Sequence, residues 1–512
     1  MTYTSLAYLL AFLPVMLALY ILLPRGLRRY LLLAASYLFY LLFSPKLIVY
    51  LLASTAIIYF SGRWMEKCAA VPAAVKKRRT IFWCAVILQL GTLLFLKFYN
   101  FAGWYINALF TRLSLSASLP TLTLVLPLGI SFFTLQAVSY LADVYKKTIP
   151  ADGDFWRLAL YMAFFPTIME GPICRYSQTA EALSAGENLK YENICFGAQR
   201  IIWGLFKKLV IADRLNPVVA TVFNNPPPYH GAVVLFSAIC YTLQLYADFS
   251  GCIDITIGTA EMFGITLPEN FRQPFLSRTP SEFWRRWHIT LGAWLRDYVF
   301  YPLSLTRFVK RLGKKARAKL GKHLGSVVQT VLPLLAVWIC NGLWHGTGWN
   351  YLFYGLYYFA LILLGNLTEP LTAKAAATLH LGEGSAVRRA IQTVKMAVIV
   401  VTGELFFRAA NLHQGFSLFL SIFSGFRLSA LSSAVLAKLG LSIQDLAAVS
   451  VGLALVLIVG ILHEKGIHIR KTVSGWKTGF RWSLYIAAIL AVLIFGAYGA
   501  GYVAVDPIYA NF

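Results

Sequence analysis

The sequence predicts an all-α protein that crosses a membrane many times, and its composition, its apolar runs and its basic connections all lead to this fold class. Hydrophobic residues make up 58% of the 512 residues, charged residues make up 13%, and the mean hydropathy is +0.65. Soluble domains carry about 25% charged residues, so this apolar surface is too large for one soluble core. The composition therefore predicts a polytopic membrane protein.

Apolar runs suited to membrane helices recur along nearly the whole chain. Several are shorter than the roughly 20 residues that a perpendicular helix needs, which predicts eleven or more transmembrane or re-entrant helices. The first run has no basic region before it and no cleavage site, so we expect a retained helix rather than a signal peptide. The runs are 6–23, 30–43, 47–60, 81–96, 155–168, 232–246, 327–343, 351–364, 391–407, 449–462 and 483–498.

Basic residues are concentrated in the connections between apolar runs, and the net charge is +25. The connections 25–29, 63–79, 307–322 and 465–481 hold most of them. Because basic connections stay on the cytoplasmic side, this pattern places these four segments inside and both termini outside. Such charge is typical of segments that orient a membrane protein in the bilayer and that attract anionic lipid. We therefore expect the lipid bilayer, and not nucleic acid, as a partner. The segment 307–322 is also suited to docking an acidic carrier protein.

Two histidines stand in surroundings fit for lipid or a protein core. His345 follows Trp344 in an aromatic run, and His288 ends the segment 281–288, in which charged residues and tryptophan lie close together. The bilayer penalises an ionisable group unless it is paired, so both are functional candidates. A helix from Val327 would place His345 about 28 Å along, near the outer face unless the helix tilts or breaks. A buried histidine bonded to a helix carbonyl is the alternative for His345.

The segment 281–302 has a helical pattern of polar residues. As one helix it would place Arg285, His288 and Arg296 on one stripe, beside a stripe of tryptophan and leucine. An interfacial amphipathic helix with tryptophan at the headgroup level explains the same pattern, so both interpretations stay open.

Three more segments place proline, glycine or charge within or beside apolar runs: 126–133, 170–176 and 244–251. Such residues interrupt helices and are tolerated where protein or a cavity satisfies the backbone. The three segments therefore predict broken helices around a polar cavity in the membrane.

Five stretches carry a resemblance to a known family. They are LPLGISFFTLQAVSYLADVY from Leu126, EGPICRY from Glu170, QLYADFSGCIDITIG from Gln244, ENFRQPFLSRTPSEFWRRWHITLGAWLRDYVFYPL from Glu269 and NGLWHGTGWNYLFYGLYY from Asn341. The sequence resembles the membrane-bound O-acyltransferase family, and in particular its bacterial branch of alginate O-acetylation proteins. The resemblance implies tilted and re-entrant helices around a central tunnel that joins the two membrane faces. It places the family's essential histidine on His345 and its second polar site on the segment with His288.

This resemblance implies a domain organisation. A single membrane-embedded acyltransferase domain is expected over 1–512. Within it, we expect a motif-bearing catalytic core over 120–366 and a C-terminal helical extension over 367–512.

Acyl transfer to a hydroxyl requires a base, and neutral imidazole fits that role. We expect His345 to be this base, since burial disfavours the imidazolium form. His288 or Asn341 can donate to the developing oxyanion, which in other enzymes contributes about 2.7–4 kcal/mol per donor. The remaining candidates, for substrate binding or support, are Trp344, Arg285, Arg296, Asp297 and Asp248.

The sequence favours an O-acetyltransferase of the bacterial cytoplasmic membrane that modifies cell-envelope polysaccharide. The implied donor is acetyl-CoA or an acylated carrier on the cytoplasmic side, and the implied partner is a polysaccharide acceptor or an extracytoplasmic acetyltransferase. The alternatives are a D-alanyl or other acyl transferase for teichoic acid or lipid, and an acyl-group transporter or flippase that feeds a separate transferase. The seven cysteines show no close metal-ligand spacing, so neither a metal site nor a tightly bound cofactor is predicted.

Overall fold

The computed structural model describes residues 2–382, 384–498, 502 and 505. In this part of the chain the regular structure is helical, apart from one isolated β-bridge between Phe271 and Trp287. Contacts divide the chain into two compact units. Unit 1 holds the residues up to Ile201 together with Cys252–Pro268, and unit 2 holds Ile202–Gly251 and Glu269–Val505. The division into a core over 120–366 and an extension over 367–512 stays a prediction.

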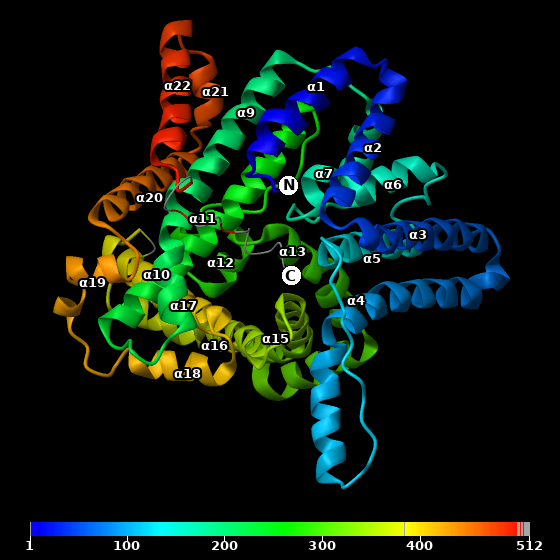
Figure 1. Cartoon of the computed structure of the whole chain (residues 1–512). Coiled ribbons are helices and arrows are strands. Elements are labelled where there is room, and N and C mark those ends of the chain that lie inside the picture. The colour runs from blue at the N-terminus through cyan, green and yellow to red at the C-terminus, as the bar shows by residue number, and fades with distance from the viewer. Residues whose placement is uncertain (1, 383, 499–501, 503–504, 506–512) are drawn as a thin grey trace. The chain divides into compact units, whose positions relative to one another are not determined.

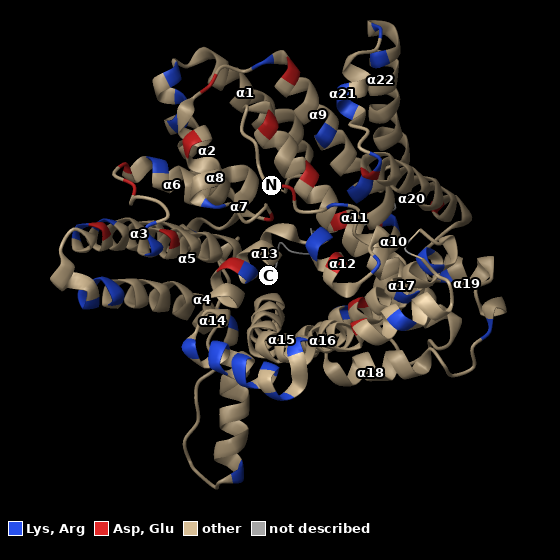
Figure 2. Cartoon of the chain, turned by 180° about the vertical axis from the view of Figure 1, so that it is seen from behind, with Lys and Arg blue, Asp and Glu red and all other residues tan. Residues whose placement is uncertain are grey.

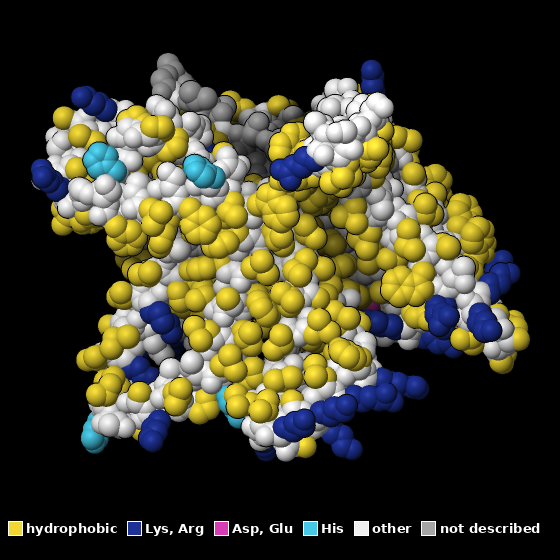
Figure 3. Space-filling model, turned by 90° about the horizontal axis from the view of Figure 1, so that it is seen from below, with side chains coloured by type: hydrophobic (Ala, Val, Ile, Leu, Met, Phe, Trp, Pro, Cys, Tyr) yellow, Lys and Arg dark blue, Asp and Glu magenta, His cyan; other side chains and the backbone are white. Residues whose placement is uncertain are grey.

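Nine helices in the described residues are long and apolar enough to cross a membrane, which confirms the polytopic all-α class. The apolar stretch of the last of these helices is only 6% buried, so its side chains are available to lipid. The face seen in Figure 3 is largely hydrophobic, with lysine and arginine near its margins. The nine segments are Arg25–Phe43, Pro45–Ala69, Pro72–Arg112, Ala232–Met262, Arg307–His345, Trp349–Thr378, Ala386–Arg408, Ile443–Glu464 and Thr478–Phe495, and Ala7–Leu22 is a shorter apolar helix.

Unit 1 packs α3, α4 and α5 against one another, and α6 packs against α2 and α8 (Figure 1). The predicted run 155–168 is not one helix, because Phe164 leaves the helical conformation between α6 and α7 and Pro166 opens α7. The helices are α1 (Leu13–Leu22), α2 (Arg25–Phe43), α3 (Ile48–Ala69), α4 (Val75–Arg112), α5 (Ile130–Lys146), α6 (Phe155–Ala163), α7 (Phe165–Ile168), α8 (Tyr176–Ala185) and the start of α9 (Tyr191–Leu205).

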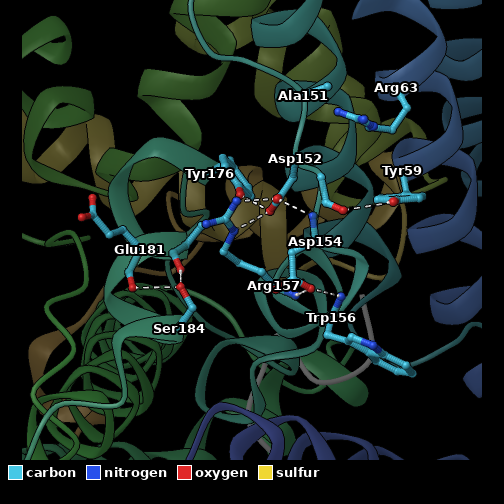
Figure 4. Close-up of polar contacts among 12 residues, drawn as sticks. Tyr59, Arg63, Ala151, Asp152, Asp154, Trp156, Arg157, Tyr176, Glu181 and Ser184 are labelled. Atoms are coloured by element: carbon cyan, nitrogen blue, oxygen red, sulfur yellow. Dashed lines mark hydrogen bonds and ion pairs between the residues drawn. The ribbon is translucent and has the colours of Figure 1, made fainter. Parts of the chain in front are cut away.

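A buried carboxylate holds the connection between α5 and α6. Asp152 accepts hydrogen bonds from Arg157 Nε at 2.7 Å and from the Tyr176 hydroxyl, and Figure 4 shows both side chains pointing toward it. Burial alone would raise the pKa of Asp152, but these hydrogen bonds hold it below its usual range. Asp154 then caps α6 by accepting from the Trp156 backbone N–H at 2.9 Å. Since Tyr176 ends the motif 170–176, this motif fixes α8 against α6.

Unit 2 contains most of the remaining helices. Among them α15 and α16 pack along each other, and α17 packs against α16 and α18 (Figure 1). The bounds are α10 (Asp213–Asn224), α11 (Ala232–Met262, which ends in unit 1), α12 (Pro280–Arg286), α13 (Ile289–Leu295), α14 (Tyr301–Ser304), α15 (Arg307–His345), α16 (Trp349–Thr378), α17 (Ala386–Arg408), α18 (Leu412–Ser421), α19 (Ser433–Lys438), α20 (Ile443–Glu464), α21 (Ile469–Ser474) and α22 (Thr478–Phe495).

The basic segment 307–322, predicted as a connection, forms the first half of α15. Thr306 caps it by accepting from the Val309 backbone N–H, and its lysine, arginine, alanine and leucine residues are strong helix formers. The backbone leaves the helical conformation at Gly321, where φ is 81°. Figure 2 shows lysine and arginine close together on this first half. The positive charge therefore lies on a helix that precedes the apolar, membrane-crossing half of α15.

Two of the three segments predicted to interrupt helices begin or connect them. Gly129 precedes α5 with a left-handed φ of 67°, and the motif 170–176 links α7 to α8. The third prediction is wrong, because 244–251 lies inside the unbroken helix α11. Its polar side chains are accommodated by buried partners rather than by a break in the backbone.

Candidate active site

The end of α15 and the start of α16 form a close hairpin that carries His345. A Cβ atom on Gly342 would lie 2.6 Å from the Tyr351 carbonyl oxygen, and one on Gly355 would lie 2.3 Å from the Trp338 carbonyl oxygen. Any larger residue at these positions would push the two helices apart. The glycines of the motif therefore set the separation of α15 and α16, and the helix ends at His345.

Aromatic rings surround His345, which is 2% exposed. The centre of its imidazole lies 4.9 Å from the Trp344 ring, 5.1 Å from the Phe407 ring and 6.1 Å from the Tyr354 ring. All three rings meet the imidazole nearly edge to face. The imidazole therefore sits among side chains from α15, α16 and α17, which limit its rotation.

Asn341 lies one helical turn before His345 and shares its face of α15. It is 4% exposed, and its Oδ1 accepts no hydrogen bond from the described residues. Buried polar atoms normally have partners, so a substrate group that donates to Oδ1 would be favoured here. On the α16 side of the same hairpin, Asn350 Nδ2 donates to the Ala409 carbonyl at 2.9 Å and fixes the end of α17 beside the start of α16.

His288 lies at a break in the chain, which corrects the prediction of one helix over 281–302. Helix α12 ends at Arg286, His288 takes a left-handed conformation with φ 46° and ψ 50°, and α13 starts at Ile289. The single polar stripe through Arg285, His288 and Arg296 therefore does not form. His288 is 1% exposed, and burial lowers its pKa to about 3, so its imidazole is neutral near pH 7.

The structure brings the two predicted histidines together through Trp344. The His288 ring centre lies 5.5 Å from the Trp344 ring, whose centre is 4.9 Å from His345. Phe249, on α11, lies edge-on to His288 at 4.9 Å. Residues far apart in sequence thus form one buried, aromatic site with two imidazoles in unit 2.

The predicted charged residues lie outside this aromatic cluster. Arg285 and Arg296 are exposed, and Arg296 pairs with Asp297 at 3.0 Å. Asp248 is 1% exposed and pairs with Lys208, which also contacts Asp213 at 2.8 Å. Lys208 lies on a π-helical turn, Phe206–Ala212. This ion cluster holds α11 next to α10, and so positions Phe249 against His288.

Residues 29–403 match the membrane-bound O-acyltransferase family, and this range includes all eight predicted site residues. The chain belongs to this family. The match confirms the resemblance inferred from the five sequence motifs. The roles of the individual site residues stay predictions.

Several proteins are similar to the chain over about half of its length or more. A probable alginate O-acetylase of Azotobacter vinelandii is 31% identical over 356 residues, which are 69% of this chain and 65% of that protein. A peptidoglycan O-acetyltransferase of Helicobacter pylori is 35% identical over 262 residues, 46% of each chain. A teichoic acid D-alanyltransferase of Bacillus subtilis is 31% identical over 246 residues, 47% of this chain and 59% of that protein. The similarity therefore spans less than two thirds of each relative.

Two buried polar residues of this family member were missed by sequence reasoning. Glu404 on α17 is fully buried and accepts a hydrogen bond from the Tyr354 hydroxyl at 3.0 Å. A carboxylate in an apolar run is a functional candidate by the same rule that selected the histidines, so this signal was present in the sequence. Asn270 contacts His288, and no spacing in the sequence indicated it.

Each of the two histidines lies near the end of a long apolar helix, His288 near the end of α20 and His345 at the end of α15. Two residues before His288, Arg286 binds Glu464 at 2.6 Å, at the end of α20 that precedes the basic connection 465–481. His345 ends α15 and lies beside the start of α16. Asn350, at the start of α16, is bonded to the chain just after α17, and the basic first turns of α17 are at its other end. The site therefore lies beside one helix end that precedes a basic connection and beside another that is remote from the basic first half of its helix.

Proposed function

We propose that this chain is an O-acyltransferase of the bacterial cytoplasmic membrane, and that it moves acetyl groups from a cytoplasmic donor to hydroxyls of cell-envelope polysaccharide. Family membership supports acyl transfer, and the activities after which three relatives are named support alginate, peptidoglycan or teichoic acid as the kind of acceptor. The observation that carries the proposal is the pair of buried histidines on either side of Trp344.

In the proposed reaction, His345 is the general base. Its neutral imidazole takes the proton of the acceptor hydroxyl as the hydroxyl oxygen attacks the acyl carbonyl carbon. The new C–O bond forms, the C–S bond of a thioester donor breaks, and the imidazolium returns the proton to the leaving thiolate. The aromatic walls exclude water, which would otherwise compete with the acceptor hydroxyl. The acyl donor, acetyl-CoA or an acylated carrier protein, is part of the proposal.

Purified protein in detergent with a labelled acetyl thioester and an oligosaccharide acceptor tests the reaction. We expect ester product from the wild type and a loss of at least about 100-fold in His345→Gln, the lower end of what a general base contributes. His413→Gln is the matched control, because His413 is an exposed histidine on α18 and should keep full activity. Full activity in folded His345→Gln would overturn the assignment of the base.

A further inference from the structure

Asn270 lies in the connection between α11 and the short 3-10 helix η5 (Pro274–Leu276), where both its side chain and its backbone hold the segment around His288. It is fully buried. Its carbonyl accepts from the Ile289 backbone N–H at 3.0 Å, and its Oδ1 accepts from the Thr290 backbone N–H at 3.0 Å. The Thr290 hydroxyl donates to the same Oδ1 at 2.9 Å. The side-chain oxygen also contacts His288. The two oxygens of Asn270 therefore make four contacts, which fix the start of α13.

The contact with His288 has only one favourable arrangement. A backbone N–H is always a donor, so the atom that faces Thr290 N must be the amide oxygen of Asn270 and not its nitrogen. His288 Nδ1 lies 3.3 Å from this oxygen. Two acceptors at that distance would repel each other, so Nδ1 must carry the proton. In a neutral imidazole, the proton on Nδ1 leaves Nε2 with a lone pair.

The backbone of His288 is held in a strained conformation by these contacts. The left-handed conformation costs free energy at a residue other than glycine, because its Cβ comes close to the following carbonyl oxygen. The bonds from Ile289 and Thr290 to Asn270, together with the Arg272 N–H to Arg286 carbonyl bond at 2.9 Å, hold the two chain segments side by side and offset this cost. Strain that the surroundings impose in this way is common at functional sites.

We propose that Asn270 is a positioning residue that fixes His288 as the tautomer protonated on Nδ1, so that Nε2 accepts a hydrogen bond or proton from the substrate. This inference rests on the proposed acyl transfer. It removes His288 from the candidates for the oxyanion donor and leaves Asn341 as the donor among the residues predicted for that role. His288 then orients the acceptor hydroxyl, or takes a proton beside His345, and the site holds two imidazole acceptors.

The protein labelled with 15N histidine and reconstituted in lipid gives the direct test. The His288 signals are identified as those lost in His288→Gln, and nitrogen shifts distinguish a protonated from an unprotonated ring nitrogen. We expect a protonated Nδ1 and an unprotonated Nε2 in the wild type, unchanged from pH 8 to pH 5. A proton on Nε2 in the wild type would overturn the proposal. This readout does not depend on acyl transfer, so it can fail or succeed separately from the proposed function.

Variants of Asn270 extend the test to activity. Asn270→Asp keeps an oxygen acceptor and should keep the tautomer, with transfer within about 10-fold of wild type. Asn270→Ala removes the acceptor, so His288 should lose its single tautomer and transfer should fall about 100-fold, as expected for a small misplacement of a reacting group. If folded Asn270→Ala keeps the wild-type nitrogen shifts, the amide does not fix the tautomer. If Asn270→Ala does not fold, the wild-type spectrum and Asn270→Asp still decide the matter.

Discussion

Tyr354→Phe removes a single hydroxyl behind His345 and should destabilise the protein while acyl transfer stays close to the wild-type rate. The hydroxyl donates to Glu404 Oε1 at 3.0 Å, and Glu404 is fully buried. A buried carboxyl that loses this donor costs about 1–3 kcal/mol of stability. The Tyr354 ring, 6.1 Å from the His345 ring, stays in place in the variant. The wall of the site is therefore preserved while the bond behind it is lost.

A double-mutant cycle with Glu404→Leu isolates this bond. In the Glu404→Leu background there is no carboxyl to satisfy, so Tyr354→Phe should cost little. The coupling between the two changes should be about 1–3 kcal/mol, measured from thermal unfolding of the four proteins in detergent. Acyl transfer by each protein is measured in parallel, and Tyr354→Ala should lower it because the ring is lost.

Tyr357→Phe is the matched control for the cycle. Its hydroxyl donates to the Ile399 carbonyl at 2.9 Å rather than to Glu404, so its cost should be the same with and without Glu404→Leu. The reasoning is refuted if Tyr354→Phe costs the same free energy in both backgrounds. It is also refuted if Tyr354→Phe abolishes transfer without changing stability, since the hydroxyl would then act in the reaction.

Three further changes have outcomes that follow from the packing and charges of unit 2. Lys208→Met leaves Asp213 and Asp248 buried without their cation, and should cost about 3–5 kcal/mol in thermal unfolding, with partial recovery when Asp248→Asn is added. Gly342→Ala places a Cβ 2.6 Å from the Tyr351 carbonyl and should cost about 1–3 kcal/mol and reduce transfer, whereas Gly365→Ala, with open space around it, should cost nothing in either assay. Burial lowers the pKa of His288 to about 3, so the unfolded chain takes up a proton below about pH 6.5 that the folded protein does not. Wild-type stability should therefore fall relative to His288→Gln by about 2 kcal/mol between pH 7.5 and pH 5, and an equal pH dependence of the two proteins would contradict a buried, neutral His288.

Composition and periodicity were sufficient for the fold class, because the bilayer imposes helices and long apolar runs on any chain that spans it. They gave the wrong secondary structure where tertiary contacts determine the conformation of the backbone. The segment 281–302 has a helical pattern, yet Asn270 binds Thr290 and draws the chain into a left-handed turn at His288. The segment 244–251 was predicted to break a helix, yet Lys208 neutralises Asp248 within the continuous α11.

The candidate site was partly predictable for a related reason. His345 and His288 were found because ionisable groups are costly at membrane depth, and the same rule applies to Glu404. Asn270 could not be found in this way, since an uncharged amide in a connection carries no such signal and its role depends on a contact across 18 residues. The three charged residues Arg285, Arg296 and Asp297 were placed near the site by a helix that does not continue through His288.

Acyl transfer across sealed vesicles is the most direct measurement of the central claim that the two histidines join a cytoplasmic donor to an outer acceptor. A labelled acetyl thioester is enclosed with the reconstituted protein, and the polysaccharide acceptor is added outside. We expect labelled ester on the outer acceptor with wild type and His413→Gln, and none with His345→Gln. Label that crosses the bilayer without forming ester, and that still crosses in His345→Gln, would contradict the claim and identify the protein as a conduit for a separate transferase.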